Sequence, residues 1–96
     1  MATEEVPDTL AALAEKMATE YRESEYEIAL ALANAQEPLS TEELAEETGY
    51  TERTIKKRVD TLEEELGGDP LLRRDDEDRP VLHPTLANAV REHAAS

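Results

Sequence analysis

Cysteine, phenylalanine and tryptophan are absent from the chain, and histidine occurs only twice, as His83 and His93. Without cysteine the protein can form neither disulfides nor thiolate metal sites. The two histidines are not at the spacing of a familiar metal site, and no phosphate-binding loop or nucleophile–base pair is present. The sequence therefore predicts a protein that is not an enzyme and that has no cofactor and no metal.

Long apolar runs are also missing. No apolar run approaches the roughly 18 residues that would span a bilayer, and the N-terminus lacks the positive and apolar regions of a signal peptide. We therefore expect a cytoplasmic protein without a membrane partner. The length predicts a single domain at residues 8–96, preceded by a disordered tail at residues 1–7.

Basic residues are scarce, with 10 Lys and Arg against 24 Asp and Glu, for a net charge of −14. This acidic composition resembles that of halophilic, haloarchaeal-like proteins, in which carboxylates stay hydrated while salt screens their repulsion. A disordered acidic chain is the alternative, but the regular spacing of apolar residues favours a folded domain.

Apolar side chains recur at helical spacing near the N-terminus. Leu10, Leu13, Met17 and Tyr21 share one face of a helix predicted over residues 8–22.

A possible helix boundary follows at Ser24. Ser24 with Glu27 has the pattern of a capping box, which predicts that a second helix begins at Glu25. A single bent helix through this point is the alternative. The second helix is apolar around much of its circumference and ends between Asn34 and Pro38.

Two further helices are predicted on either side of a tight turn. Ser40 begins another capping box, which starts a short helix that runs to about Thr48. After the turn at Gly49, Thr51 caps an amphipathic helix that ends at Gly67.

The apolar period then changes from helical to extended. Residues 71–74 and 80–83 are strand candidates on either side of a charged loop, and Pro84 suits the first turn of a last helix. A hairpin directly after the second helix of a helix-turn-helix unit is the arrangement of a wing.

The predicted fold is mainly α with a small β-hairpin. It is a winged helix-turn-helix, with the helix-turn-helix at residues 40–66 and the wing at 71–83, plus an extra N-terminal helix (8–22) and a C-terminal helix. The predicted core consists of Ile28, Leu32, Leu44, Ile55, Val59, Leu62, Leu66, Leu72 and Leu82.

Three blocks in the second half of the chain have a recognisable order. They are Leu62-Glu63-Glu64-Glu65-Leu66-Gly67, Pro70-Leu71-Leu72-Arg73-Arg74 and Val81-Leu82-His83-Pro84-Thr85. With these blocks, residues 38–90 resemble the winged-helix domain of LysR-type regulators and the similar N-terminal domain of the molybdate-responsive regulator. Leu72 stands where that pattern has phenylalanine, and His83 where it has threonine. The resemblance implies a winged helix-turn-helix transcription regulator. No effector domain follows, so we expect no small-molecule effector.

Charge is distributed unevenly along the chain. Residues 1–52 carry 14 acidic and 2 basic side chains, a net −12, whereas residues 53–96 carry 10 acidic and 8 basic, a net −2. Arg53 and Lys57 lie opposite the apolar stripe of the predicted helix 51–66, on the face that a recognition helix turns to the major groove. The predicted DNA-binding residues are Thr51, Arg53, Thr54, Lys56, Lys57 and Arg58 on this helix, and Arg73, Arg74 and Arg79 on the wing.

Each basic cluster also has a simpler explanation. Lysines on the helix can form ordinary surface pairs with Asp60, and the wing arginines can balance the four acids of their own loop at residues 75–78.

The sequence therefore predicts a transcriptional regulator that reads double-stranded DNA as a homodimer. The alternative is a winged-helix protein–protein interaction module of transcription or other multi-subunit machinery, without direct DNA reading. Residues 85–95 are a second candidate for the dimer seam, and the N-terminal helix could instead only cover its own core. The predicted seam consists of Leu10, Leu13, Met17 and Tyr21.

Overall fold

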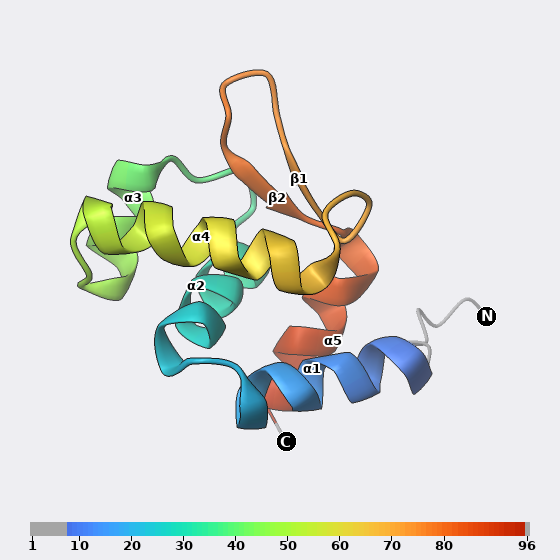
Figure 1. Cartoon of the computed structure of the whole chain (residues 1–96). Coiled ribbons are helices and arrows are strands. Elements are labelled where there is room, and N and C mark those ends of the chain that lie inside the picture. The colour runs from blue at the N-terminus through green and yellow to red at the C-terminus, as the bar shows by residue number, and fades with distance from the viewer. Residues whose placement is uncertain (1–7, 96) are drawn as a thin grey trace.

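A computed structural model describes residues 8–95, which form five helices and one antiparallel hairpin (Figure 1). The mainly helical winged fold is confirmed, whereas the predicted tail at residues 1–7 lies outside the described residues. None of the described helices is long and apolar enough to cross a membrane. The elements are α1 (Asp8–Glu20), α2 (Glu23–Asn34), α3 (Thr41–Thr48), α4 (Glu52–Leu66), β1 (Leu72–Arg74), β2 (Pro80–Leu82) and α5 (Pro84–Ala95).

Local capping fixes the ends of α3 and α4 where the sequence predicts them. The Ser40 hydroxyl accepts a hydrogen bond from the Glu43 backbone N–H, and the Glu43 carboxylate accepts one from the Ser40 N–H, so the capping box of α3 is confirmed. Gly67, with φ 81°, ends α4 in the left-handed conformation that glycine adopts without a Cβ clash.

The predicted capping box at Ser24 is wrong. Helix α2 begins at Glu23, so Ser24 lies inside its first turn, and the residue before the helix is Arg22, in an extended conformation without a side-chain cap. Glu25, Ile28 and the rest of the buried face lie on one continuous helix from Glu23. Packing of this face, rather than the local Ser-x-x-Glu pattern, sets where the helix begins. The break at Arg22 also excludes one bent helix through α1 and α2.

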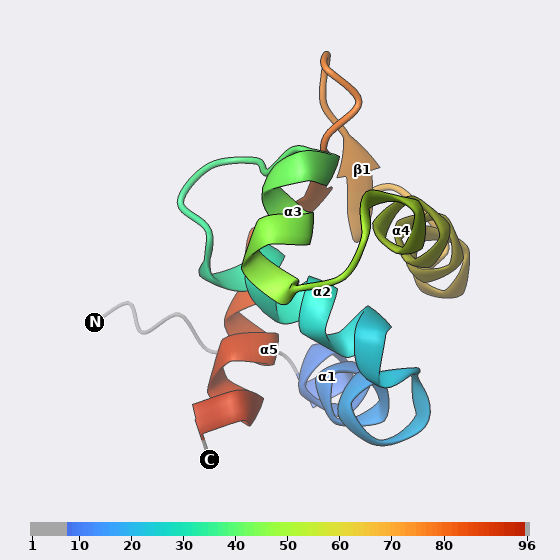
Figure 2. The ribbon, with the colours of Figure 1, turned by 90° about the vertical axis from the view of Figure 1, so that its left-hand side faces the viewer.

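Helix α2 lies at the centre of the molecule. It packs against α1, α3, α4, α5 and β2, and Figure 2 shows it enclosed by the other helices. The guanidinium of Arg91 on α5 donates to the Ala33 carbonyl and ties α5 to the C-terminal end of α2. This central place explains why α2 is apolar around much of its circumference.

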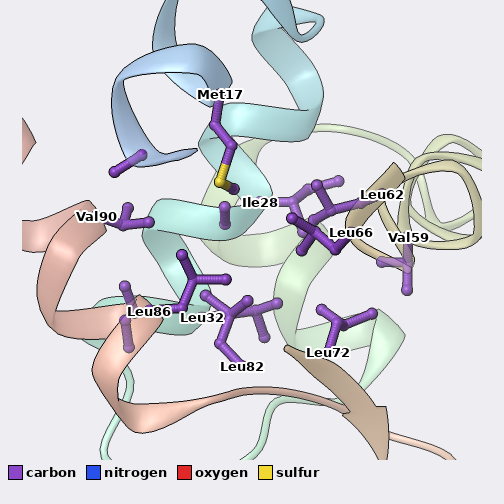
Figure 3. Close-up of a cluster of buried hydrophobic side chains, with 14 of the residues drawn as sticks. Met17, Ile28, Leu32, Val59, Leu62, Leu66, Leu72, Leu82, Leu86 and Val90 are labelled. Carbon is purple, nitrogen blue, oxygen red and sulfur yellow. The ribbon is translucent and has the colours of Figure 1, made fainter. Parts of the chain in front are cut away.

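The core is formed by aliphatic side chains from all five helices and both strands (Figure 3). All nine predicted core residues are buried, which confirms the helical phasing used in the sequence analysis. The structure adds Met17 of α1, and Leu86 and Val90 of α5, each fully buried.

The wing stands beside α4 (Figure 1), and its strands pack against α4 and α2. Its strands pair Leu72 with Leu82, Arg73 with Val81 and Arg74 with Pro80. Because side chains alternate along a strand, Leu72 and Leu82 both face the core, where they are buried. Arg73, on the opposite face, is exposed.

Candidate nucleic-acid interface

The turn between α3 and α4 has the tight geometry of a helix-turn-helix unit. Gly49 adopts φ 86° and donates its N–H to the Ala45 carbonyl at 2.8 Å, which closes the last turn of α3. The Thr48 hydroxyl donates to the Leu44 carbonyl at 2.7 Å. The left-handed residue redirects the chain, so that α4 starts after only three residues.

Thr51 fixes the first turn of α4, as predicted. Its hydroxyl oxygen accepts a hydrogen bond from the Thr54 backbone N–H at 3.2 Å, and its hydroxyl lies 3.0 Å from that of Thr54. The two threonines therefore form a polar start to the helix. Thr51 is exposed and Thr54 is half-buried, so the helix N-terminus stays accessible.

Arg53, Lys56 and Lys57 are exposed on the first half of α4. Within residues 8–95, none of the three side chains makes a hydrogen bond or an ion pair. A polyanion could therefore approach them without displacing an internal partner. Arg58 is different, because it is half-buried and its Nε is enclosed without a hydrogen-bond partner in the described part of the chain.

Arg74 of the wing is held by the acidic second half of α4. Its Nε and Nη2 donate to Glu63 Oε1 at 3.1 and 2.9 Å, and Nη2 also donates to Asp60 Oδ1 at 2.9 Å. Asp78 lies 3.8 Å from Nη1. Partial burial lowers the pKa of Arg74, but the hydrogen bonds to Glu63 and Asp60, with the charges of Glu63 and Asp78, outweigh it and raise the pKa overall.

Arg79 is likewise bound within the wing. Its Nε donates to Asp75 Oδ2 at 2.8 Å, and the backbone N–H groups of Arg79 and Glu77 donate to Asp75 Oδ1 at 2.8 and 2.9 Å. The Arg79 backbone and side-chain hydrogen bonds lower the pKa of Asp75, despite an opposing effect of burial. Asp75 therefore stabilises the hairpin when ionised, and this contribution is lost as pH falls through its lowered pKa.

Apart from the half-buried Arg58, the predicted basic residues of the DNA-binding surface thus form two groups. Arg53, Lys56, Lys57 and Arg73 present unpaired charges to solvent in the described structure. Arg79 pairs with Asp75 of the wing loop, as the charge-balance explanation expects, whereas the close partners of Arg74 are Asp60 and Glu63 of α4 rather than the loop acids. A direct phosphate contact by these two arginines stays a prediction.

The predicted dimer residues lie mostly within the chain's own fold. Met17 is fully buried in the core, whereas Leu10, Leu13 and Tyr21 are half-buried and pack against it. Helix α1 also packs along α5. Covering its own core is therefore one established role of this helix, and pairing with a second copy stays a prediction.

Sequence reasoning missed a buried acid at Glu25, which is 1% exposed. Neither carboxylate oxygen has a hydrogen-bond partner of normal geometry in the described chain. Burial raises the pKa of Glu25, and so does its neighbour Glu65 on α4; Arg22 lowers it by less. The sequence did contain a signal for this burial. Glu25 lies three residues before Ile28 and four before Ala29, so all three share the buried face of α2.

The arrangement is that of a winged helix-turn-helix protein. The second helix of the helix-turn-helix unit, α4, begins with a cationic face that is exposed to solvent. A family model described as an HTH domain matches residues 25–73, which are 49 of the 96 residues. The chain belongs to this family of DNA-binding helix-turn-helix domains. Searches of curated proteins and of solved structures found no match.

Proposed function

We propose that the protein is a sequence-specific transcriptional regulator that inserts α4 into the major groove of double-stranded DNA. The observation that carries the proposal is the exposure of Arg53, Lys56 and Lys57 on the first half of α4, without an internal ion pair in the described residues. A recognition helix presents its N-terminal residues to base edges, and this is where the three cations lie.

Charge along α4 limits how the helix can sit in the groove. Asp60 and Glu64 are exposed further along the same helix and would repel phosphates. Arg74 offsets part of this repulsion, because it pairs with Asp60 and Glu63. In the proposed complex the first two turns of α4 enter the groove, while the C-terminal half stays beside the wing.

The cations have different proposed roles. Arg53 reads a base edge, since arginine can donate two parallel hydrogen bonds to guanine. Thr54 and Lys57 face the base edges with Arg53, whereas Lys56 and exposed Arg73 contact the phosphates on either side and set the register. We further propose a homodimer, because a single module of this size buries little surface on DNA and two-fold pairing doubles the contact.

The acidic composition supports a high-salt setting for this function. At about 1 M salt the Debye length is about 3 Å, so the net charge of −14 would repel DNA only weakly. Base contacts and shape would then carry more of the affinity than phosphate attraction. The proposed relationship to LysR-type and molybdate-responsive regulators rests on the residue pattern between positions 62 and 85.

Selection of bound duplexes from random DNA in molar potassium chloride tests the proposal. We expect a defined site to emerge, and Arg53→Ala to relax its preference at one base pair by about 1–3 kcal/mol. The double variant Arg53→Ala with Lys57→Ala should lose the site.

A matched control removes the same charge far from α4. The control is the double variant Lys16→Ala with Arg22→Ala. It changes one residue on α1 and one at the α1–α2 junction, and it should leave the selected sequence and its affinity unchanged. If the Arg53 and Lys57 double variant binds the selected site as tightly as the unaltered chain, groove reading by α4 is wrong. The winged helix would then be better explained as a protein-interaction module.

A further inference from the structure

A groove lies between α2, α3 and the segment that connects them. It encloses about 570 Å³. Its apolar floor is formed by Leu30 and Ala31 of α2 and by Leu39 of the connection, and each of these side chains is only half-buried. These three side chains therefore leave part of their apolar surface in contact with solvent.

The rim of this groove is acidic. Glu27, Glu37 and Glu47 line it from α2, the connection and α3. Residues 23–52, which form both helices, contain nine glutamates and no lysine, arginine or histidine. Within residues 8–95, none of these three glutamates forms an ion pair with a lysine or an arginine.

The groove faces away from the candidate DNA-binding surface. No residue of α4 or of the wing lines it. In Figure 2 the connection arches outward on one side of α3, while α4 lies on the other side. DNA bound at α4 would therefore leave the groove open, and one molecule could hold both ligands at once.

We infer that this groove is a docking site for a basic segment of another protein, one that presents an apolar side chain flanked by lysine or arginine. The apolar side chain would cover Leu30, Ala31 and Leu39, and its basic neighbours would pair with Glu27, Glu37 and Glu47. Charge complementarity selects this partner, because an acidic or neutral segment would leave the rim carboxylates unpaired. A helix-turn-helix protein with such a site joins DNA to a second protein.

The test uses the full chain, labelled with ¹⁵N, and two synthetic peptides. The first is an amphipathic peptide with leucines on one face flanked by lysine and arginine, and the second carries serine in place of the leucines. At an ionic strength of about 0.1 M, where charges still act over about 10 Å, the leucine peptide should shift the amide signals of residues 27–39 and 47–48. The serine peptide should bind at least about tenfold more weakly, because it cannot fill the apolar floor.

Two charge-matched variants locate the effect. Glu27→Gln, Glu37→Gln and Glu47→Gln together should weaken the leucine peptide about five- to tenfold, since each exposed ion pair contributes little alone. Asp8→Asn, Glu15→Gln and Glu20→Gln together change the net charge equally on α1 and should leave affinity within about twofold.

Three results would overturn the inference. They are equal binding of the two peptides, equal weakening by the two triple variants, or the absence of shifts at millimolar peptide. If the groove signals instead move with protein concentration before peptide is added, the occupant is a second copy of this chain. Binding of the selected DNA by the rim variant should stay unchanged, so this test stands apart from that of the proposed function.

Discussion

Among the described residues, Glu25 is the one charged side chain that is buried. Its pKa is raised by burial and by Glu65, so the folded chain holds the proton more tightly than the unfolded chain does. The contribution of Glu25 to the free energy of unfolding is therefore fully present below the ordinary carboxyl pKa and is lost as pH rises through the raised value. Burial also raises the pKa of Tyr21. The negative charges of Glu65, Glu25 and Glu20 act in the same direction.

Glu25→Met should stabilise the protein at pH 7 by about 1–2 kcal/mol, because it removes a buried carboxylate without hydrogen-bond partners. It forgoes only the small benefit of an acid at a helix N-terminus. Urea unfolding between pH 4 and pH 8 measures this, and the variant should lose most of the pH dependence. Glu25→Gln, which removes the charge alone, should flatten the curve with a smaller gain. If the free energy of unfolding of either variant changed with pH as steeply as that of the unaltered chain, Glu25 would not titrate in this range.

At the scale of elements, Arg74 joins the wing to α4. Its two donor nitrogens reach Glu63 and Asp60, which lie three residues apart and therefore on neighbouring turns of one helix face. With a side chain that is 26% exposed, this pairing is sheltered better than an ordinary surface ion pair. The hairpin and α4 should consequently move as one body.

Arg74→Ala should lower the free energy of unfolding by about 1 kcal/mol, near the upper end for partly exposed ion pairs. The adjacent Arg73→Ala is a close control, because that side chain is exposed and unpaired in the described chain, and should change stability by less than about 0.5 kcal/mol. Urea unfolding gives both values, and hydrogen exchange in β1 should rise only for Arg74→Ala. Equal effects of the two changes would show that the pairing with α4 contributes nothing.

Sequence predicted the elements whose ends are set by local chemistry. The capping box at Ser40, the threonine cap at Thr51 and the left-handed glycine at Gly67 each need only residues within one turn. The pattern at Ser24 was equally local but wrong, because packing of the face that contains Glu25 placed the helix start two residues earlier.

The candidate site was predictable in part. Periodicity placed Arg53 and Lys57 on the outer face of α4, and both are exposed there. The pairing of Arg74 with Glu63 was not predictable, because it depends on how the hairpin crosses α4. The groove between α2 and α3 was not predictable for the same reason, because it depends on how α2, α3 and their connection are placed relative to one another.

For the molecule as a whole, the proposed dimer requires a surface that the single chain leaves open. Met17 cannot contribute, because it is buried, so Leu10 and Leu13 at the start of α1 are the best remaining residues. Sedimentation equilibrium in molar salt should give a dimer, and Leu10→Ser with Leu13→Ser should shift it towards monomer. Ala12→Ser, on the exposed face of the same helix, should not. A monomer at high micromolar concentration would remove the dimer from the proposal.

The separation of charge between α2–α3 and α4 has an electrostatic consequence. Nine glutamates without a cation occupy residues 23–52, and four cations follow within residues 53–58. The molecule therefore carries a permanent dipole moment between α2–α3 and the start of α4. The field of a DNA duplex exerts a torque on this dipole and turns the cationic helix towards the DNA before contact, although the net charge of −14 slows the approach. Added salt screens the repulsion between the net charge of the protein and the DNA before it screens the attraction of the cationic helix, because the repulsion acts over the longer distance. Orientation is thus selected during the encounter itself.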